Sequence, residues 1–521
     1  MDNGKQTENV KRSVFSGVLW RFAERFGAQI VTLVVSLVLK WFVLPDAYGI
    51  VSLTMVIITF ANVFVVSGFG SALIQKKDAD SLDFSSVFYF NIVFSLLLFA
   101  AIFFAAPLIA AAFPAYDKTL LTAVLRVLGL RLPLAAMNNL QHAYVSRKMW
   151  FRKFFFATLW GTLLSAAVGI TLACLGCGVW AVVAQYLTNS FVDTLFLWLT
   201  VKWRPRWEFS FARLRGLLSY GWKLLLSSLI DTGYNQLRPI LIGMIDSGCD
   251  LSIYDNGKQY PQVLAVNLNT AVSSVLFPVI SRYQDDPAMV KAMTRRSVRV
   301  SSYVMFPMML GLAAVAPSVI RLVLPESWLP SIPFWIICCV TYAFWPVHTA
   351  NLEALKAVGR TDLYLRLEII KKLLGIASIA AVLCFCPDRT LSFTLGGIPL
   401  EVKSRVLNLA LSSIPVSLVS TFLNAHPNKR LLGYRYREQL RDMAPAAGLG
   451  IFMFAAVFAT YLLPLPAGRL WTALLLCGQV LLGAGLYVGL SALLRLDSFS
   501  YLKNILAGYL HRRKAPEEEN A

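Results

Sequence analysis

Charged residues are scarce in this 521-residue chain: Asp, Glu, Lys and Arg together make up 15% of it, whereas 57% is hydrophobic. A soluble domain carries about 25% charged residues, and a disordered chain has far fewer apolar ones. The composition therefore excludes both classes. Because the apolar residues fall into stretches of about 20, it predicts an all-α polytopic membrane protein.

Residues with catalytic chemistry are also few. Only four His occur, and the chain has no phosphate-binding P-loop, no metal-spaced His/Cys cluster and no Ser/His/Asp set. The predicted outer loops are too short to hold the catalytic carboxylates that a membrane-embedded acyl- or glycosyltransferase would need. We therefore favour transport over catalysis, and we expect neither a cofactor nor a metal.

The eight Cys lie mostly inside apolar stretches, without the spacing of an extracellular disulfide framework. We interpret them as small apolar membrane residues. Cys174 and Cys177, at an outer helix end, could form a disulfide, although a tight turn of small residues is the favoured interpretation.

Fourteen apolar stretches are long enough to cross a bilayer. An even number of spans places both ends of the chain on the same side of the membrane. The predicted limits are 13–43, 47–67, 84–110, 120–140, 154–175, 178–200, 217–245, 253–280, 297–320, 331–354, 366–386, 405–424, 442–463 and 468–494.

Positive charge is concentrated on one side of this arrangement. The N-terminus, every second loop with its flanking helix ends, and the C-terminus hold 34 of the 48 Lys and Arg residues, against 6 in the other loops and 8 within spans. Positively charged loops face the cytoplasm, so both termini are predicted to be cytoplasmic. The net charge of +20 thus reflects membrane orientation and does not predict nucleic-acid binding.

An internal repeat relates spans 1–6 to spans 7–12 at an offset of about 202–212 residues. Residues 44–49 (LPDAYG) correspond to 245–248 (IDSG), and 133–153 to 345–365. Two halves in the same orientation make a parallel repeat. The predicted segments are a six-helix bundle (1–200), a basic cytoplasmic linker (201–216), a second six-helix bundle (217–441), an extra helix pair (442–494) and a cytoplasmic tail (495–521).

Polar side chains recur at helical spacing inside spans 1 and 7, and one offset of 202 relates the two stripes. Charged groups in hydrocarbon are costly and usually face a wet cavity or each other. We therefore predict that both stripes line a cleft between the halves. The predicted cleft residues are Arg21, Glu24, Arg25, Gln29, Asp231, Asn235, Arg238 and, at the start of span 8, Lys258.

Other interpretations of these charges stay open. Arg21 lies near the cytoplasmic end of its span and could snorkel, and Glu24 could pair locally with Arg21 or Arg25. In span 4, Arg126 and Arg131 are weaker candidates, because either could contact lipid phosphates. His348 is favoured as a hydrogen-bonded packing residue over a proton carrier.

Several local motifs resemble those of a known superfamily. They are SGVLW at 16–20, LPDAYGI at 44–50, FGSALIQ at 69–75, AVSSVLFPVISR at 271–282 and EALKAVGRTD at 353–362. Their order, the fourteen spans and the polar first helix resemble the multidrug/oligosaccharidyl-lipid/polysaccharide exporter superfamily. Within it, the chain resembles the polysaccharide transporter branch, the O-antigen and exopolysaccharide flippases.

This resemblance implies a flippase in the inner membrane of a bacterium, which moves a polyprenyl-diphosphate-linked oligosaccharide by alternating access. It suggests coupling to a proton or sodium gradient, with Glu24 and Asp231 as the carboxylates to test. Implied partners are the lipid-linked oligosaccharide, membrane lipids, and a polysaccharide polymerase with its chain-length machinery, and we expect a monomer. A peptidoglycan lipid-precursor flippase and a drug or cation antiporter of the same superfamily stay open as alternatives.

Overall fold

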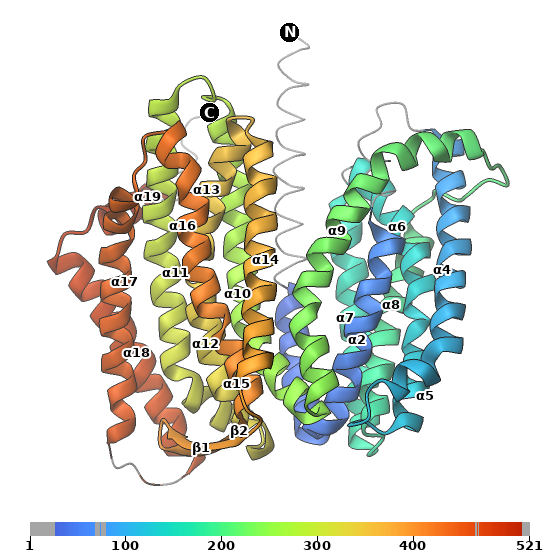
Figure 1. The fold of residues 1–521 in the computed structure, drawn as a ribbon, viewed down its shortest axis with the longest axis horizontal. Coiled ribbons are helices and arrows are strands. Elements are labelled where there is room, and N and C mark those ends of the chain that lie inside the picture. The colour runs from blue at the N-terminus through green and yellow to red at the C-terminus, as the bar shows by residue number, and fades with distance from the viewer. Residues whose placement is uncertain are drawn as a thin grey trace, which may run out of the picture. The chain divides into compact units, whose positions relative to one another are not determined.

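The computed structural model describes residues 27–67, 73, 80–148, 150–463, 466 and 468–512. Within these residues the chain is helical apart from one β-hairpin, and ten helices are long and apolar enough to cross a membrane (Figure 1). The chain forms two compact units, Met1–Ser252 and Ile253–Ala521. It is thus an all-helical membrane protein, as the composition predicts.

The first unit holds the early helices, and short polar caps begin several of them. Asp80 and Asp83 form a reciprocal capping box at the start of α4, in which the Asp83 amide donates to Asp80 Oδ1 at 2.9 Å. A helical segment over residues 27–42 comes first. The elements that follow are α2 (Pro45–Val66), α4 (Ser81–Ala111), α5 (Lys118–Gly129), α6 (Arg131–Arg147), α7 (Phe151–Cys174), α8 (Val179–Thr200) and α9 (Phe211–Ile245).

Within this unit α9 packs along α2 and also touches α4. At the end of α9 the chain turns into α10 (Gly248–Ser281), which begins in the first unit and continues in the second. Gly248 meets Gly49 of α2 so closely that a Cβ on Gly49 would lie 2.0 Å from the Gly248 carbonyl oxygen. Span 7 therefore packs within the first unit, although by sequence repeat it opens the second half.

The second unit is built around the long helix α11 (Pro287–Val323), which packs on α12, α13, α17 and α18. Asp286 caps its N-terminus by accepting from the Ala288 and Met289 amides. The remaining elements are η1 (Glu326–Ser331), α12 (Ile332–Tyr342), α13 (Trp345–Ala357), α14 (Thr361–Phe385), β1 (Thr390–Leu395), β2 (Ile398–Lys403), α15 (Ser404–Leu411), α16 (Ser413–Leu431), α17 (Tyr436–Ala459), η2 (Thr460–Leu462), α18 (Arg469–Leu493) and α19 (Asp497–Arg512).

Each predicted span coincides with helix in the described residues, but ten of the helices meet the length and apolarity of a membrane crossing. Four predicted spans correspond to helices that are too short within the described residues, or too polar, to meet these two criteria. They are 13–43, 178–200, 217–245 and 366–386. Spans 120–140 and 331–354 are each broken into two helices, at Leu130 and at Ala343–Phe344. These breaks lie about one repeat offset apart in the sequence, which agrees with the internal repeat.

Two connections have defined structures. The predicted outer loop 387–404 contains the antiparallel pair β1–β2, whose two-residue turn has Gly396 and Gly397 at φ values of 58° and 75°. Positive φ at both turn positions is what such a hairpin favours. Cys174 and Cys177 are free thiols beside a turn in which Gly176 and Gly178 also have positive φ. The small-residue turn therefore agrees with the favoured interpretation.

Candidate functional site

The predicted cleft residues are described only in part. Arg21, Glu24 and Arg25 lie outside the described residues. On α9, Asn235 Nδ2 donates to Asp231 Oδ2 at 3.2 Å, so the two side chains share one helix face as predicted. The remaining members are Gln29 in the segment over residues 27–42, Arg238 on α9 and Lys258 on α10. That the two stripes face each other across a cleft stays a prediction.

A polar seam in the first unit was not predicted from the sequence as a group, although Arg131 was a weaker candidate. It runs between α6 and α8 and consists of Arg131, Asn138, His142, Ser190 and Asp193. Arg131 Nε donates to Ser190 Oγ at 3.1 Å, and its guanidinium lies 5.3 Å from the centre of the Tyr186 ring. The seam starts at the break between α5 and α6, and interrupted helices at corresponding places in two halves are typical of transporter binding sites.

Asp193 is the one carboxylate of this α6–α8 seam. Its Oδ2 accepts from Asn138 Nδ2 at 2.5 Å and lies 3.6 Å from His142 Nε2. The Oδ1 atoms of Asp193 and Asn138 are buried and accept no hydrogen bond from the described residues. Unsatisfied buried oxygens are uncommon and call for a partner such as an ion or water. The seam is therefore a candidate site for a proton or a small cation.

The second unit also has a polar cluster, which follows the break between α12 and α13, and most of its polar atoms are hydrogen-bonded, although Asn428 Oδ1 is buried and accepts no hydrogen bond from the described residues. Asn351 Nδ2 donates to Gln439 Oε1 at 3.0 Å, and Asn428 Nδ2 donates to Asn351 Oδ1 at 2.8 Å. The buried carboxylate of Glu353 accepts from Ser273 Oγ at 2.6 Å and from Lys356 Nζ at 2.7 Å. These bonds join α10, α13, α16 and α17, so this cluster suits packing between helices.

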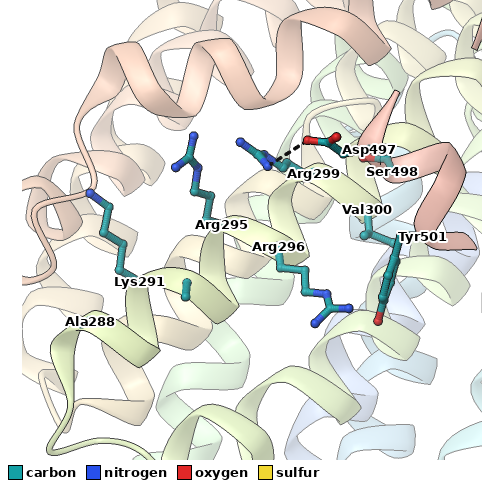
Figure 2. A pocket seen from close by; sticks show the side chains of 10 residues that line it. Ala288, Lys291, Arg295, Arg296, Arg299, Val300, Asp497, Ser498 and Tyr501 are labelled. Carbon is teal, nitrogen blue, oxygen red and sulfur yellow. Dashed lines mark ion pairs between the residues drawn. The ribbon is translucent and has the colours of Figure 1, made fainter. Parts of the chain in front are cut away.

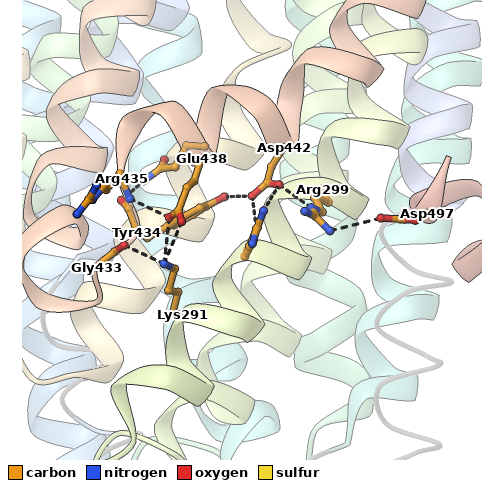
Figure 3. Close-up of polar contacts among 10 residues, drawn as sticks. Lys291, Arg299, Gly433, Tyr434, Arg435, Glu438, Asp442 and Asp497 are labelled. Carbon is orange, nitrogen blue, oxygen red and sulfur yellow. Dashed lines mark hydrogen bonds and ion pairs between the residues drawn. The ribbon is translucent and has the colours of Figure 1, made fainter.

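A second buried carboxylate, Asp442 of α17, holds two cations of α11 (Figure 3). Arg295 donates to it twice, from Nε at 2.6 Å and from a terminal nitrogen at 3.1 Å, and Arg299 Nε donates at 2.7 Å. The Tyr434 hydroxyl adds a third donor at 2.9 Å. The Asp442 side chain is only 1% exposed, so its charge depends on these donors.

Beside this network, α11 and α19 enclose a pocket of about 450 Å³, here called the basic pocket (Figure 2). The wall from α11 carries four cations, whereas α19 supplies one carboxylate. Its lining residues are Ala288, Lys291, Ala292, Arg295, Arg296, Arg299, Val300, Asp497, Ser498 and Tyr501. The excess of positive charge makes it a candidate site for an anion.

A family model for polysaccharide biosynthesis proteins matches residues 38–333, more than half of the chain. The chain belongs to the polysaccharide biosynthesis protein family. Family relatives include teichuronic acid biosynthesis protein TuaB of Bacillus subtilis, 24% identical over 62% of this chain and 67% of TuaB. Succinoglycan biosynthesis transport protein ExoT of Rhizobium meliloti is 23% identical over 68% of this chain and 71% of ExoT.

Solved structures share the fold of this family member. The lipid II flippase MurJ in an inward closed conformation matches with a TM-score of 0.69 and 14% identity, over 92% of this chain and 98% of MurJ. An inward-facing multidrug resistance MATE transporter of the MOP superfamily matches with a TM-score of 0.57 and 17% identity. The match covers 78% of this chain and 98% of that transporter. The resemblance to the polysaccharide transporter branch of the exporter superfamily is thus confirmed.

The family member also carries site residues that sequence reasoning missed or ranked low. Arg131, a weaker candidate from the sequence, lies in the α6–α8 seam, whereas Arg126 donates from Nε to the Phe103 carbonyl at 3.1 Å. The signal for Asp193 was available, since an Asp inside an apolar span normally has a function. His348 Nε2 lies 2.8 Å from Thr421 Oγ1, a contact suited to packing.

One motif of the resemblance has defined electrostatics. Arg360 immediately precedes α14, and Asp362 lies in the first turn of that helix. The two side chains form a bidentate pair with two N···O distances of 3.0 Å. Hydrogen bonding from Arg360 lowers the pKa of Asp362 to about 2. This carboxylate is therefore ionised at any physiological pH, which suits a structural role at the end of the motif.

Proposed function

We propose that this protein is a flippase that moves a polyprenyl-diphosphate-linked oligosaccharide, the repeat unit of a polysaccharide, across the cytoplasmic membrane of a bacterium. The family match over residues 38–333 carries this proposal. A fold shared with MurJ and the repeat in the sequence support it. The polar head of such a lipid cannot cross hydrocarbon unaided, and two halves that rock about a cleft would expose it to each side in turn.

The proposed arrangement has fourteen spans with both termini in the cytoplasm. The split of 34 against 6 positive residues between the two sets of loops supports this orientation. Two six-helix halves would form the transport path, and α17 and α18 would be the extra pair. A bond of 2.9 Å from Ser318 Oγ on α11 to Gln479 Oε1 on α18 helps to hold that pair against the second half.

The proposed substrate site is the cleft lined by the two polar stripes. Arg21, Arg25 and Arg238 would bind the diphosphate, because a guanidinium gives phosphate two parallel, charge-assisted hydrogen bonds. The other polar members of the stripes, Gln29 and Asn235, would contact the sugar. The polyprenyl tail would stay in the lipid.

Coupling to a proton or sodium gradient is proposed at three carboxylates. Glu24 and Asp231 belong to the stripes, and Asp231 already accepts from Asn235. Asp193 is the third, because it lies in the α6–α8 seam with an unsatisfied buried oxygen. A carboxylate that binds the coupling ion in one state and releases it in another would link ion flow to the movement of the halves.

Two alternatives differ from this proposal in substrate. The MurJ fold favours a flippase for the lipid precursor of peptidoglycan, and the MATE fold a drug or cation antiporter. The excess of Arg and Lys within the predicted spans argues against a cationic substrate. Further expected partners are a polysaccharide polymerase and its chain-length machinery, and the expected state is a monomer.

Deletion of the gene in its own host, followed by extraction of polyprenyl-linked glycans, tests the proposal. We expect lipid-linked repeat units to accumulate on the inner leaflet and the surface polysaccharide to disappear, with normal growth. Lysis with loss of cross-linked cell wall would instead indicate the peptidoglycan precursor. Normal polysaccharide together with increased sensitivity to cationic drugs would indicate the antiporter.

A further inference from the structure

We propose that the basic pocket binds the phosphate of an anionic phospholipid headgroup, at a site separate from the transport path. The pocket lies wholly within the second unit, between the first turns of α11 and the C-terminal helix α19 (Figure 2). Its volume of about 450 Å³ is ample for a phosphate with its glycerol. No role in the proposed transport mechanism depends on it.

The charges of the pocket are unbalanced. Lys291, Arg295, Arg296 and Arg299 line it, and Asp497 is the one carboxylate among the lining residues. Asp442 of α17, which does not line the pocket, offsets part of this positive charge because it pairs with Arg295 and Arg299. A phosphate in the pocket would offset the remainder and would accept hydrogen bonds from several donors at once.

The guanidinium groups are held in position and still have donors to offer. Arg295 uses Nε and one terminal nitrogen on Asp442, and Arg299 uses Nε. In the described part of the chain no carboxylate pairs with Arg296, whose guanidinium lies 3.9 Å from the centre of the Tyr501 ring. Groups already fixed by other contacts lose less conformational freedom when a ligand binds.

Asp497 occupies the position of a competing anion. Its carboxylate is 89% exposed and lies 3.6 Å from a terminal nitrogen of Arg299. An exposed pair at this distance contributes little free energy. An incoming phosphate can therefore replace the Asp497 carboxylate at Arg299 at low cost.

The sequence of α19 indicates that the phosphate belongs to a lipid. In the sequence of α19, Phe499, Leu502, Leu506 and Leu510 recur at the spacing of one helix face, and Lys503 lies at the edge of that face. Such a helix lies in the plane of the membrane surface. Because α19 follows directly on the membrane helix α18, the pocket beside it lies at the depth of the headgroups, where basic pockets bind anionic lipids.

Native mass spectrometry of the full-length protein in a non-ionic detergent tests this site. The protein is titrated with phosphatidylglycerol, with phosphatidylcholine as the zwitterionic comparison. We expect one phosphatidylglycerol to bind at least about tenfold more tightly than phosphatidylcholine, and Arg296→Gln to remove that preference because a charge-assisted contact is lost. Arg296 has no part in the Asp442 network, so this variant should fold normally.

Two further variants make the test specific. Asp497→Asn should strengthen phosphatidylglycerol binding several-fold, because it removes a negative charge that would repel the phosphate in the pocket. Arg282→Gln makes the same charge change as Arg296→Gln on an exposed residue just before α11, outside the pocket, and should leave binding unchanged. Equal losses in the two Arg→Gln variants, or no effect of Asp497→Asn, would overturn the proposal.

The source of the phosphate is tested separately. Millimolar inorganic phosphate is added during the phosphatidylglycerol titration. A lipid site should retain its phosphatidylglycerol, because the glycerol and acyl chains add contacts beside α19. Complete displacement by inorganic phosphate would show a site for a soluble phosphate and would overturn the assignment to a lipid.

Discussion

Gly49 and Gly248 touch through their backbones, and the sequence repeat aligns the segments 44–49 and 245–248 in which they lie. A Cβ on Gly49 would fall 2.0 Å from the Gly248 carbonyl oxygen and 2.3 Å from its carbonyl carbon. Corresponding segments of the two sequence repeats therefore meet at one point, where only glycine fits at position 49. The contact joins the start of α2 to the turn between α9 and α10.

Gly49→Ala should destabilise the protein by at least about 1–3 kcal/mol, because the obstructing atoms belong to the backbone and cannot rotate away. Thermal unfolding followed by size-exclusion chromatography of the detergent-solubilised protein measures this. Gly485→Ala on α18 is the matched control, since a Cβ there has no neighbour within 4 Å. We expect Gly485→Ala to be neutral or slightly stabilising; equal unfolding temperatures for both variants would contradict the close contact.

Asp442→Asn should destabilise the second unit by roughly 3–5 kcal/mol, because two guanidiniums lose the buried charge that holds them. The nearby pair of Lys291 and Glu438, at 3.0 Å and partly exposed, supplies the comparison. Glu438→Gln should cost less than about 1 kcal/mol. The two unfolding temperatures, measured side by side, check this difference, and a larger effect of Glu438→Gln would show that Asp442 is not the organising group.

Local sequence signals predicted the helices better than the contacts between them. Apolar length placed helix at each predicted span, since a bilayer leaves the backbone little choice. The hairpin in 387–404 was missed, although two six-residue strands around Gly396–Gly397 are a readable signal. Arg295 and Asp442 lie 147 residues apart, and no pattern within either helix indicates that they meet.

In the candidate site, too, relations within one helix could be predicted from the sequence, whereas contacts between helices could not. Helical spacing correctly placed Asp231 and Asn235 on one face, because that relation is local. The α6–α8 seam depends on how two helices separated by a third pack together, and its central pair, Asn138 and Asp193, is 55 residues apart. The polar residues of α8 at 186, 190 and 193 recur at helical spacing, but nothing in that spacing indicates that they meet α6.

Topology provides a prediction that does not depend on any site residue. In a variant without its native cysteines, a single Cys at Ser392 in β1 should react with a membrane-impermeant maleimide in intact cells. A Cys at Arg430, in the segment after span 12 that we predict to be cytoplasmic, should react only after the membrane is permeabilised. Both positions are exposed, so access depends on the membrane alone. Labelling of position 430 in sealed cells would defeat the orientation set by the positive charges.

Asp193→Asn should reduce gradient-driven transport about tenfold or more while the protein still folds, because the carboxylate can no longer exchange a proton or cation. Movement of a fluorescent lipid-linked sugar analogue between the two leaflets of sealed proteoliposomes, with and without an imposed gradient, measures this. Asp117→Asn, at the exposed cap of α5, is the control and should be silent, since Asn is also a good cap. An unchanged response to the gradient in Asp193→Asn would return the coupling role to Glu24 or Asp231.

Substitution of Arg25 and Arg238 tests the proposed contacts with the diphosphate. Each Arg→Gln change should weaken binding of the lipid-linked sugar by about 1.5–3 kcal/mol, the free energy of a hydrogen bond to a charged group. Arg→Lys should restore only part of this binding free energy, because an ammonium keeps the charge but loses the planar pair of donors.

Export of polysaccharide in the deletion host, at matched protein levels in the membrane, is the readout for these variants. Arg126→Gln is the control, since that guanidinium donates to the Phe103 carbonyl. If the double Arg→Gln variant exports at the normal rate, these two residues do not bind the substrate, and the predicted cleft loses its main support.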